Sequence, residues 1–452
     1  MFERQHTSLF TKKAIAGLLD SAGMSMAGQT TSGPSSLPGG VQPTFNLDMW
    51  DMGAGEANII PNIPDNVSPT FTRATTATTV LSNGLIASVA TGVARSYYDP
   101  TSLTYLGYLA EGARTNLCLQ SEDLATTWSV VDTTITVNAT TAPDGAATAD
   151  LCTEGTAGSA NVSQAITATA DVTHTFSMWL KRGNTDWVRL SIQENTASAN
   201  RCDAWFNLAT GAAGSVANAG TGTSAASSIK AYPDGWYRCV VSGNAGNAAT
   251  SIYAFSGSAS ADAITTRVNN ATRYEWGAQF ENNVAFASSY IPTTTAAVAR
   301  NADVLTYPTT GWLNAAAGTF LVQAQVSSLQ VGLSLAQVSD GTVNERINIL
   351  LGATGVGSVF TVDGGVTQTN FSTANTTSAN TSFSLAAAYA VNDFAVALDG
   401  GTVATDTSGT LPTVTTLGVG NNNGASQPFG PILRVQFYPV RLPNASLQVL
   451  TA

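Results

Sequence analysis

Residues 430–438 read Gly-Pro-Ile-Leu-Arg-Val-Gln-Phe-Tyr, and this stretch gives the clearest indication of the fold class. Two sets of side chains alternate along it, one with Leu433, Val435 and Phe437, the other with Ile432, Arg434, Gln436 and Tyr438. Successive side chains of a strand point to opposite faces of a sheet, so a period of two predicts a β-strand. The strand then meets a corner flanked by Pro439 and Pro443 and a short terminal stretch, Ser446 to Leu450.

The same period recurs through the last two thirds of the chain. Alternating stretches fall at residues 176–181, 188–193, 204–208, 236–241, 252–255, 320–326, 347–351 and 394–398. Turn signals such as Gly183-Asn184, Pro233-Asp234-Gly235 and Asp399-Gly400 separate them. Many short strands with turns between them predict antiparallel sandwiches or jelly rolls.

The chain length sets the number of domains. With 452 residues, the chain exceeds what one hydrophobic core normally serves. We predict an all-β fold with two antiparallel β-sandwich (jelly-roll) domains in series, after an extended N-terminal arm with a short helix. The predicted segments are an anchoring arm over 1–70, a β connector over 71–110, a first sandwich over 111–301 and a second over 302–452.

The charge balance argues against two classes of partner. Only 10% of the residues are charged, the net charge is −11 and the isoelectric point is about 4.5. An acidic chain lacks the basic field that attracts nucleic acid or an anionic membrane. No stretch is apolar enough to cross a bilayer. We therefore expect no nucleic-acid partner and no membrane insertion.

The N-terminal arm carries two features. A lysine pair precedes the apolar run 14–19, which predicts a short amphipathic helix, with a poor signal peptide as the alternative. Residues 29–64 are rich in Gly, Pro, Ser and Asn, and such a segment orders only by lying on another surface. We predict that it attaches the chain to a particle; a flexible linker is the alternative. The predicted virion-attachment residues are Phe45, Leu47, Met49 and Trp50.

The cysteines and histidines are too few and too scattered for a zinc site. The four cysteines are Cys118, Cys152, Cys202 and Cys239, none in a Cys-x-x-Cys pair, and the histidines are His6 and His174. We predict no metal site and no cofactor, while a structural cation such as calcium stays open. We interpret the cysteines as buried free thiols, with a disulfide such as Cys118 to Cys239 as the alternative.

Three motifs and the C-terminal strand carry family resemblances. The stretch Glu111-Gly-Ala-Arg-Thr-Asn-Leu117, with Ser121-Glu-Asp123 after it, resembles the opening of carbohydrate-binding-module-like β-sandwiches in bacteriophage structural proteins. Tyr274-Glu-Trp-Gly-Ala-Gln-Phe-Glu281 and Ala299-Arg-Asn-Ala-Asp303 resemble the far edge of that domain. The last strand and corner resemble the end of a concanavalin-like or laminarin-G-like lectin domain.

The resemblance implies a virion appendage protein of tail-fibre or head-spike type. Such a subunit would be assembled in the host cytoplasm and reside in the virion. Its arm would contact other virion proteins, and its lectin-like sandwiches would bind a host-surface glycan for host attachment. Fibres and spikes of this kind are usually trimers, so a homo-oligomer is expected.

No catalytic residues are predicted, and we do not expect an enzyme. A Ser-His-Asp or Cys-His device needs a histidine against a nucleophile, whereas His6 lies in the arm and His174 at a strand entry. Two carboxylates could hydrolyse a glycan. However, sequence spacing cannot pair Glu194, Glu275 and Glu281.

Alternation also predicts a carbohydrate-binding face. Burying the apolar residues of 186–194 and 202–208 turns two tryptophans and several polar side chains to the opposite face of the sheet. Sugars bind to such mixtures, because a C–H face stacks on an aromatic ring while amide and guanidinium groups take the hydroxyls. The predicted binding residues are Trp187, Arg189, Gln193, Trp205 and Asn207. Alternatively, Trp187 and Trp205 pack against a loop, a neighbouring domain or another subunit.

Other candidates are weaker. Trp179, Trp236 and Trp276 are expected in the core. In the last domain, Asn344, Arg346 and Asn348 alternate imperfectly with apolar residues, and Asn421-Asn-Asn-Gly424 reads as a rim loop or simply a turn.

Other functions remain open beside the glycan-binding appendage. The main alternative is a virion decoration, collar or adaptor protein with no glycan-binding role. A capsule depolymerase is disfavoured because no β-helix repeat and no acid pair are evident, and a secreted adhesin is disfavoured by the poor signal peptide.

Overall fold

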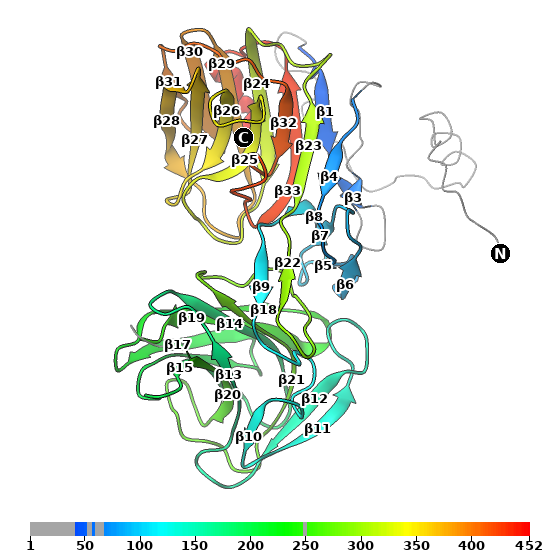
Figure 1. The fold of residues 1–452 in the computed structure, drawn as a ribbon, viewed down its shortest axis with the longest axis vertical. Helices are drawn as coiled ribbons and strands as arrows, with labels where there is room; N and C mark the ends of the chain where they lie inside the picture. Colours follow the sequence, from blue (N-terminus) through cyan, green and yellow to red (C-terminus); the bar gives the residue numbers. More distant parts are fainter. Residues whose placement is uncertain (1–40, 52–56, 59–66, 247–250) are drawn as a thin grey trace, which may run out of the picture. The chain divides into compact units, whose positions relative to one another are not determined.

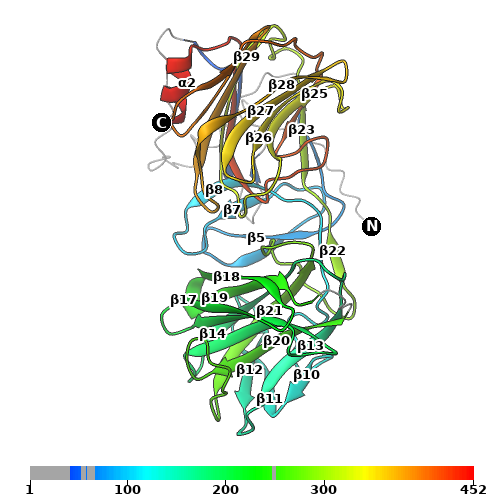
Figure 2. The same cartoon turned by 90° about the vertical axis from the view of Figure 1, so that its left-hand side faces the viewer.

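The computed structural model describes residues 41–51, 57–58, 67–246 and 251–452. In this part of the chain, strands predominate, and the α-helix is the short α2 (Asn444–Thr451), which packs against two strands near the C-terminus (Figures 1 and 2). The predicted all-β class with antiparallel sandwiches is therefore confirmed. The helix predicted over residues 14–19 lies outside the described residues.

One sandwich, which we call the inserted sandwich, is built from β10 to β21. Its first sheet has the order β10 (Ser129–Val131), β13 (Asn161–Thr167), β20 (Ser251–Ala259), β15 (Trp187–Glu194), β16 (Arg201–Asn207) and β17 (Ala212–Ala219). Its second sheet has the order β11 (Thr133–Thr140), β12 (Ala149–Glu154), β21 (Thr272–Asn282), β14 (His174–Arg182), β19 (Trp236–Asn244) and β18 (Thr223–Ala231). Fully buried apolar side chains such as Phe176, Leu190, Phe206 and Phe280 fill the space between the sheets.

The other sandwich draws its strands from two separate parts of the chain, and we call it the split sandwich. One sheet has the order β31 (Ala404–Asp406), β30 (Asp393–Leu398), β29 (Phe383–Ala390), β24 (Ala317–Ala324), β33 (Gly430–Tyr438), β8 (Tyr105–Ala110) and β7 (Ser96–Tyr98), and β1 (Phe45–Asp48) also pairs with β33. The facing sheet has the order β28 (Val366–Thr376), β27 (Val356–Asp363), β26 (Arg346–Leu351), β25 (Leu333–Ser339), β32 (Thr416–Val419), β23 (Val304–Pro308) and β4 (Thr70–Thr72).

The inserted sandwich interrupts the sequence of the split sandwich. The chain leaves β8, enters the inserted sandwich through β9 (Arg114–Asn116) and returns through β22 (Val298–Arg300) (Figure 1). These two short strands pair antiparallel. The segment predicted as a connector contributes β7 and β8 to the split sandwich, and its hairpin of β5 (Ala77–Val80) and β6 (Ile86–Val89) packs on the inserted one. The exact domain boundaries stay a prediction.

The segment around Phe45 packs on the chain's own split sandwich. Phe45 and Leu47 are fully buried, Met49 is 4% exposed, and the Phe45 ring lies 4.5 Å from that of Trp312. These three predicted attachment residues therefore serve an internal core. Trp50 belongs to β2 (Trp50–Asp51), which pairs with β3 (Ala57–Asn58).

Strand β33 follows the predicted alternation except at one point. Val435 and Phe437 are buried as expected, but Leu433 is 37% exposed while Ile432 is buried. A bulge in the pairing with β24 explains the change, because Ile432 is opposite Ala324 and Arg434 is opposite the preceding residue, Gln323. The extra residue, Leu433, shifts the alternation by one position.

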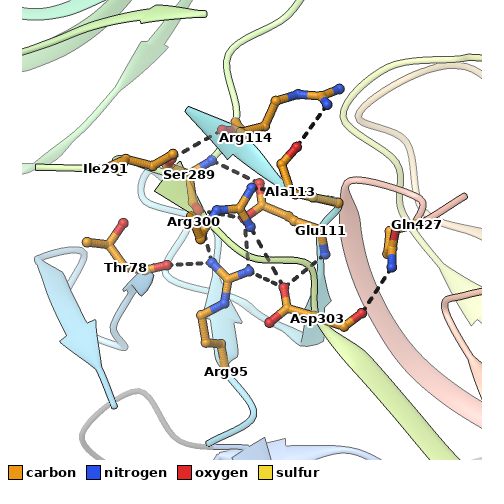
Figure 3. A network of polar contacts seen from close by, with 12 residues as sticks. Thr78, Arg95, Glu111, Ala113, Arg114, Ser289, Ile291, Arg300, Asp303 and Gln427 are labelled. Carbon is orange, nitrogen blue, oxygen red and sulfur yellow. Dashed lines mark hydrogen bonds and ion pairs between the residues drawn. The ribbon is translucent and has the colours of Figure 1, made fainter. Parts of the chain in front are cut away.

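A buried ionic network lies where the two sandwiches join (Figure 3). The carboxylate of Glu111, just after β8, forms ion pairs with Arg300 Nη1 at 2.7 Å and with Arg95 Nη2 at 2.9 Å. It also accepts a hydrogen bond from Ser289 N at 2.9 Å. Asp303, just before β23, pairs with Arg95 and with Arg73 Nη1 at 2.8 Å.

All five charged side chains of this network are at most 4% exposed. Burial on its own would raise the pKa of Glu111, but Arg300, Arg95 and the Ser289 hydrogen bonds lower it to about 2. Three guanidinium groups thus face two carboxylates, and backbone carbonyls of Thr78, Ala90 and Gly112 accept further arginine N–H groups.

Candidate functional site

Strands β15 and β16 are neighbours, as the predicted binding face requires. Trp187 lies opposite Asn207, Arg189 opposite Trp205, and Gln193 opposite Arg201. On the other side of β15, β20 places Tyr253 opposite Gln193 and Phe255 opposite Ser191. These side chains share the face that points away from the sandwich core, and we call it the outer face.

Most of the outer face is not open to solvent, so the predicted exposure is wrong for several residues. Trp205 is 2%, Arg189 6% and Gln193 8% exposed. A segment over 260–270, which we call the roof, lies on this face, and Trp205 Nε1 donates to the Ile264 carbonyl at 2.8 Å. The alternative interpretation, packing against a loop, therefore holds for Trp205. Sequence alternation cannot detect a covering loop that comes sixty residues later.

The two remaining predicted residues lie near the edge of the sheet. Trp187 is half-buried, and a Cβ atom on Gly214 of β17 would come within 2.7 Å of its ring. Asn207 is half-buried and its Oδ1 accepts the backbone N–H groups of Ala209 and Thr210, which fixes the turn after β16.

Guanidinium groups gather on the outer face. The Cζ atoms of Arg189 and Arg267 lie 4.7 and 5.0 Å from the Phe255 ring centre. Asp203 Oδ2 pairs with Arg201 Nε at 2.8 Å and with Arg189 Nη1 at 3.6 Å. Two guanidinium groups therefore share one carboxylate here, and the guanidinium group of Arg267 lies over the same ring as that of Arg189.

Burial affects the charged groups of this cluster. It lowers the pKa of Arg189, and burial together with the charge of Arg189 lowers the pKa of Arg267 to about 10, so Arg267 stays charged at neutral pH. Arg189 Nε, Arg267 Nε and Asp203 Oδ1 are buried and have no hydrogen-bond partner among the described residues. The cluster thus keeps unused hydrogen-bonding capacity and an excess of positive charge.

One row of the outer face stays accessible at its two ends beside the roof. It runs across three strands through Arg201, Gln193 and Tyr253; Arg201 and Tyr253 are partly exposed, and Gln193 between them is buried. Arg267 of the roof is also partly exposed. Tyr253 and Arg201 are not among the binding residues predicted from the sequence, although the alternation of 252–255 turns Tyr253 to this face.

The carboxylates considered for catalysis have structural partners. Glu275 accepts Arg273 Nε at 2.5 Å and Ser256 Oγ at 2.6 Å between the two sheets. Glu281 accepts Ser288 Oγ at 2.7 Å, and Glu194 accepts Asn200 Nδ2 at 2.6 Å.

His174 is also a packed residue. It is 1% exposed, stacks near Phe280, and its Nδ1 lies 2.9 Å from Asn282 Oδ1. Burial lowers its pKa despite that hydrogen bond.

The other tryptophans and the cysteines are core residues, as predicted. Trp179, Trp236 and Trp276 are each 1% exposed and pack with Ile86 and Tyr290 beneath the β5–β6 hairpin. All four cysteines are buried free thiols.

Two hollows lie near this aromatic cluster. One, of about 60 Å³, has room for only about two waters. The other, of about 350 Å³, is lined by Glu122, Asp144, Trp276 and Tyr290. Burial and the charge of Asp144 raise the pKa of Glu122, although Tyr290 Oη donates to it at 3.0 Å. Since Trp276 and Tyr290 are 1% and 3% exposed, neither ring offers a stacking face.

Two features are absent from the described residues. These residues contain no group of three or more His, Cys, Asp or Glu side chains arranged to hold a metal ion. Their helical content includes no segment with the length and apolarity needed to cross a membrane.

Comparison with known proteins gives structural neighbours only. No protein-family model matches the chain, and no curated protein sequence matches it. The Ruminococcus gnavus IT-sialidase CBM40 bound to alpha2,6 sialyllactose is 18% identical, over 30% of this chain and 84% of that chain, with a TM-score of 0.28. The NanB sialidase from Streptococcus pneumoniae is 14% identical, over 30% and 24%, with a TM-score of 0.26. The leech intramolecular trans-sialidase is 19% identical, over 30% and 23%, with a TM-score of 0.25. At these scores the likeness carries no argument about ligand or activity.

Proposed function

We propose that this chain is a non-catalytic glycan-binding protein, and that its ligand site is the accessible row of the outer face with the guanidinium cluster beside it. The observation that carries the proposal is the excess of arginine there. Arg189 and Arg267 lie over Phe255, and Asp203 is the carboxylate that pairs with both Arg189 and Arg201, in a chain whose net charge is −11. A positive cluster in an acidic protein favours an anionic ligand.

The row matches the chemistry of a carboxylated sugar. A guanidinium group presents several N–H donors in one plane and pairs well with a carboxylate. The Tyr253 ring, which is partly exposed, supplies an apolar face for the sugar C–H groups. Arg201 and Arg267 would meet the carboxylate first, because Arg189 is buried behind them.

The biological setting in the proposal is a bacteriophage virion, as a tail-fibre or head-spike subunit. The motifs beginning at Glu111 and Tyr274 support it through their resemblance to phage structural proteins. Because Phe45, Leu47 and Met49 are buried in the split sandwich, the proposal assigns contact with other virion proteins to residues 1–40. A trimer remains part of this proposal.

The rival function is a virion decoration, collar or adaptor protein that binds no glycan. Burial of Trp205 and Arg189 under the roof favours it, since a covered face can be purely structural.

The test is binding of the full-length chain to an array that holds both neutral and carboxylated glycans, and to host cells. We expect carboxylated glycans to bind, and the partly exposed Tyr253→Ala and Arg201→Ala changes to weaken that binding about tenfold, roughly 1.4 kcal/mol each. The matched control is Arg182→Ala, since Arg182 also pairs with a carboxylate but lies on the other sheet and is 48% exposed. No binding by the folded chain would support the rival, whereas binding that both variants leave unchanged would refute the proposed site.

A further inference from the structure

The seven-stranded sheet of the split sandwich has a polar outer face of its own. Along β26, Ile347, Ile349 and Leu351 enter the core, so Arg346, Asn348 and Leu350 point outward. The registers with β25 and β27 place Gln337 and Phe360 on either side of Asn348. The sequence of the Asn421–Gly424 segment predicts either a rim loop or a simple turn. In the structure this segment lies against the outer face of the sheet.

Specific hydrogen bonds hold this loop in place. Asn423 Oδ1 accepts Gln337 Nε2 at 3.1 Å and Ser339 Oγ at 2.9 Å, while Asn423 Nδ2 donates to the Thr342 carbonyl at 3.0 Å. Arg346 Nη1 donates to Asn422 Oδ1 at 3.4 Å. The loop therefore forms a fixed wall along one side of the face.

The backbone is strained in the loop and in the segment that follows it up to β33. Asn423, Ser426 and Phe429 have φ angles of 47°, 57° and 51°, in the left-handed region that side chains other than glycine rarely adopt. Three such residues within seven positions cost free energy, and strain of this kind often occurs at ligand sites.

Two polar atoms beside the wall have no partner in the described chain. Gln337 is 2% exposed and its Oε1 accepts no hydrogen bond, and Arg346 Nε is buried and donates none. A buried acceptor and a buried donor without partners are uncommon in a folded protein. A hydroxyl group both donates and accepts, so it can satisfy both of them.

The floor next to these atoms carries an aromatic ring among small polar groups. Phe360 is partly exposed, and Arg346 Cζ lies 5.1 Å from its ring centre. The register places Phe360 between Asn348 and the exposed Asn370, and Ser358 Oγ lies 2.8 Å from Ser372 Oγ. Ring, amides and hydroxyls together suit a molecule with one apolar face and many hydroxyls.

We propose that this face of β25 to β28 is a second binding site, and that its ligand is a neutral sugar. Phe360 supplies the stacking surface, Asn348 and Asn370 bind hydroxyls, and one hydroxyl lies between Gln337 Oε1 and Arg346 Nε beside the Asn423 wall. The site is independent of the outer face of the inserted sandwich, both in position and in ligand charge.

The test uses the full-length chain and isothermal titration with four neutral probes: lactose, maltotriose, mannotriose and chitotriose. We expect at least one to bind in the millimolar range or tighter. The Phe360→Ala and Asn370→Ala changes should each weaken it about tenfold, and thermal melting checks that both variants fold. Because Asn370 is exposed, its change leaves the core intact.

Two controls separate this site from the first one. Tyr253→Ala should leave neutral-sugar binding unchanged, and Val366→Ala alters a 63% exposed residue of β28 outside the proposed floor. The proposal is overturned if no probe binds the folded wild-type chain, or if Phe360→Ala and Asn370→Ala bind as well as wild type. If the wild-type chain binds a neutral sugar at this face but no carboxylated glycan, only the site on the inserted sandwich is refuted.

Discussion

Replacing Glu111 with glutamine removes one of the two carboxylates from the network that joins the sandwiches, with little change in shape. Glu111 is 3% exposed, forms ion pairs with Arg300 and Arg95, and accepts a hydrogen bond from Ser289. Its pKa falls from 4.5 to about 2 on folding, which corresponds to about 3 kcal/mol of stability at neutral pH. This agrees with the loss of about 3–5 kcal/mol that follows when one partner of a buried ion pair is removed.

The pH dependence gives this prediction a second readout. A carboxylate whose pKa is lowered by folding stabilises the protein above its unfolded pKa and loses that effect as pH falls through the folded pKa. The wild type should therefore be more stable than Glu111→Gln by about 3 kcal/mol above pH 5, and the difference should shrink toward pH 2. Urea unfolding at several pH values measures it.

A surface ion pair provides the control. Asp393 pairs with Arg441 at 2.8 Å but is 53% exposed, so Asp393→Asn should cost less than about 1 kcal/mol. The reasoning would be refuted if Glu111→Gln cost no more than this control at pH 7. It would also be refuted if the cost of Glu111→Gln were the same at pH 3 as at pH 7.

Two further predictions concern the cores. Phe45→Ala should destabilise the protein by about 3–5 kcal/mol, because the ring is fully buried against Trp312; urea unfolding checks this, and a loss below about 1 kcal/mol would mean that β1 does not dock. All four cysteines are buried, and burial raises the pKa of Cys118, Cys152 and Cys239, so a thiol reagent at pH 8 should label none until the protein is unfolded. Rapid labelling of the native chain would contradict this burial.

Local alternation predicted the strands well but not what covers them. Val188, Leu190 and Ile192 are buried as their period requires, and β15 does pair with β16. Trp205 was assigned to the correct face, yet the roof that buries it belongs to another part of the sequence. Leu433 shows a second limit, since a single bulged residue reverses the expected faces.

Long-range pairing explains the other differences. The chain order suggested two sandwiches one after the other, but β8 pairs with β33 more than three hundred residues later, and β7 joins the same sheet by pairing with β8. The motifs that begin at Glu111 and end at Asp303 were recognised as two edges of one domain. In the structure, Arg300 forms ion pairs with Glu111 and Asp303 where the two sandwiches join. The spacing of these residues in the sequence does not indicate these ion pairs.

The pairing of β9 with β22 means that the inserted sandwich begins and ends at the same place. Asn116 and Val298 are direct partners across the two strands, so the points where the chain enters and leaves lie about 5 Å apart. A domain whose two ends lie side by side can be replaced by another domain with equally close ends, and the split sandwich into which it is inserted need not change. Under the proposed function, recombination at these two positions would therefore replace the glycan-binding sandwich in a single step, while the split sandwich and its joint stay as they are.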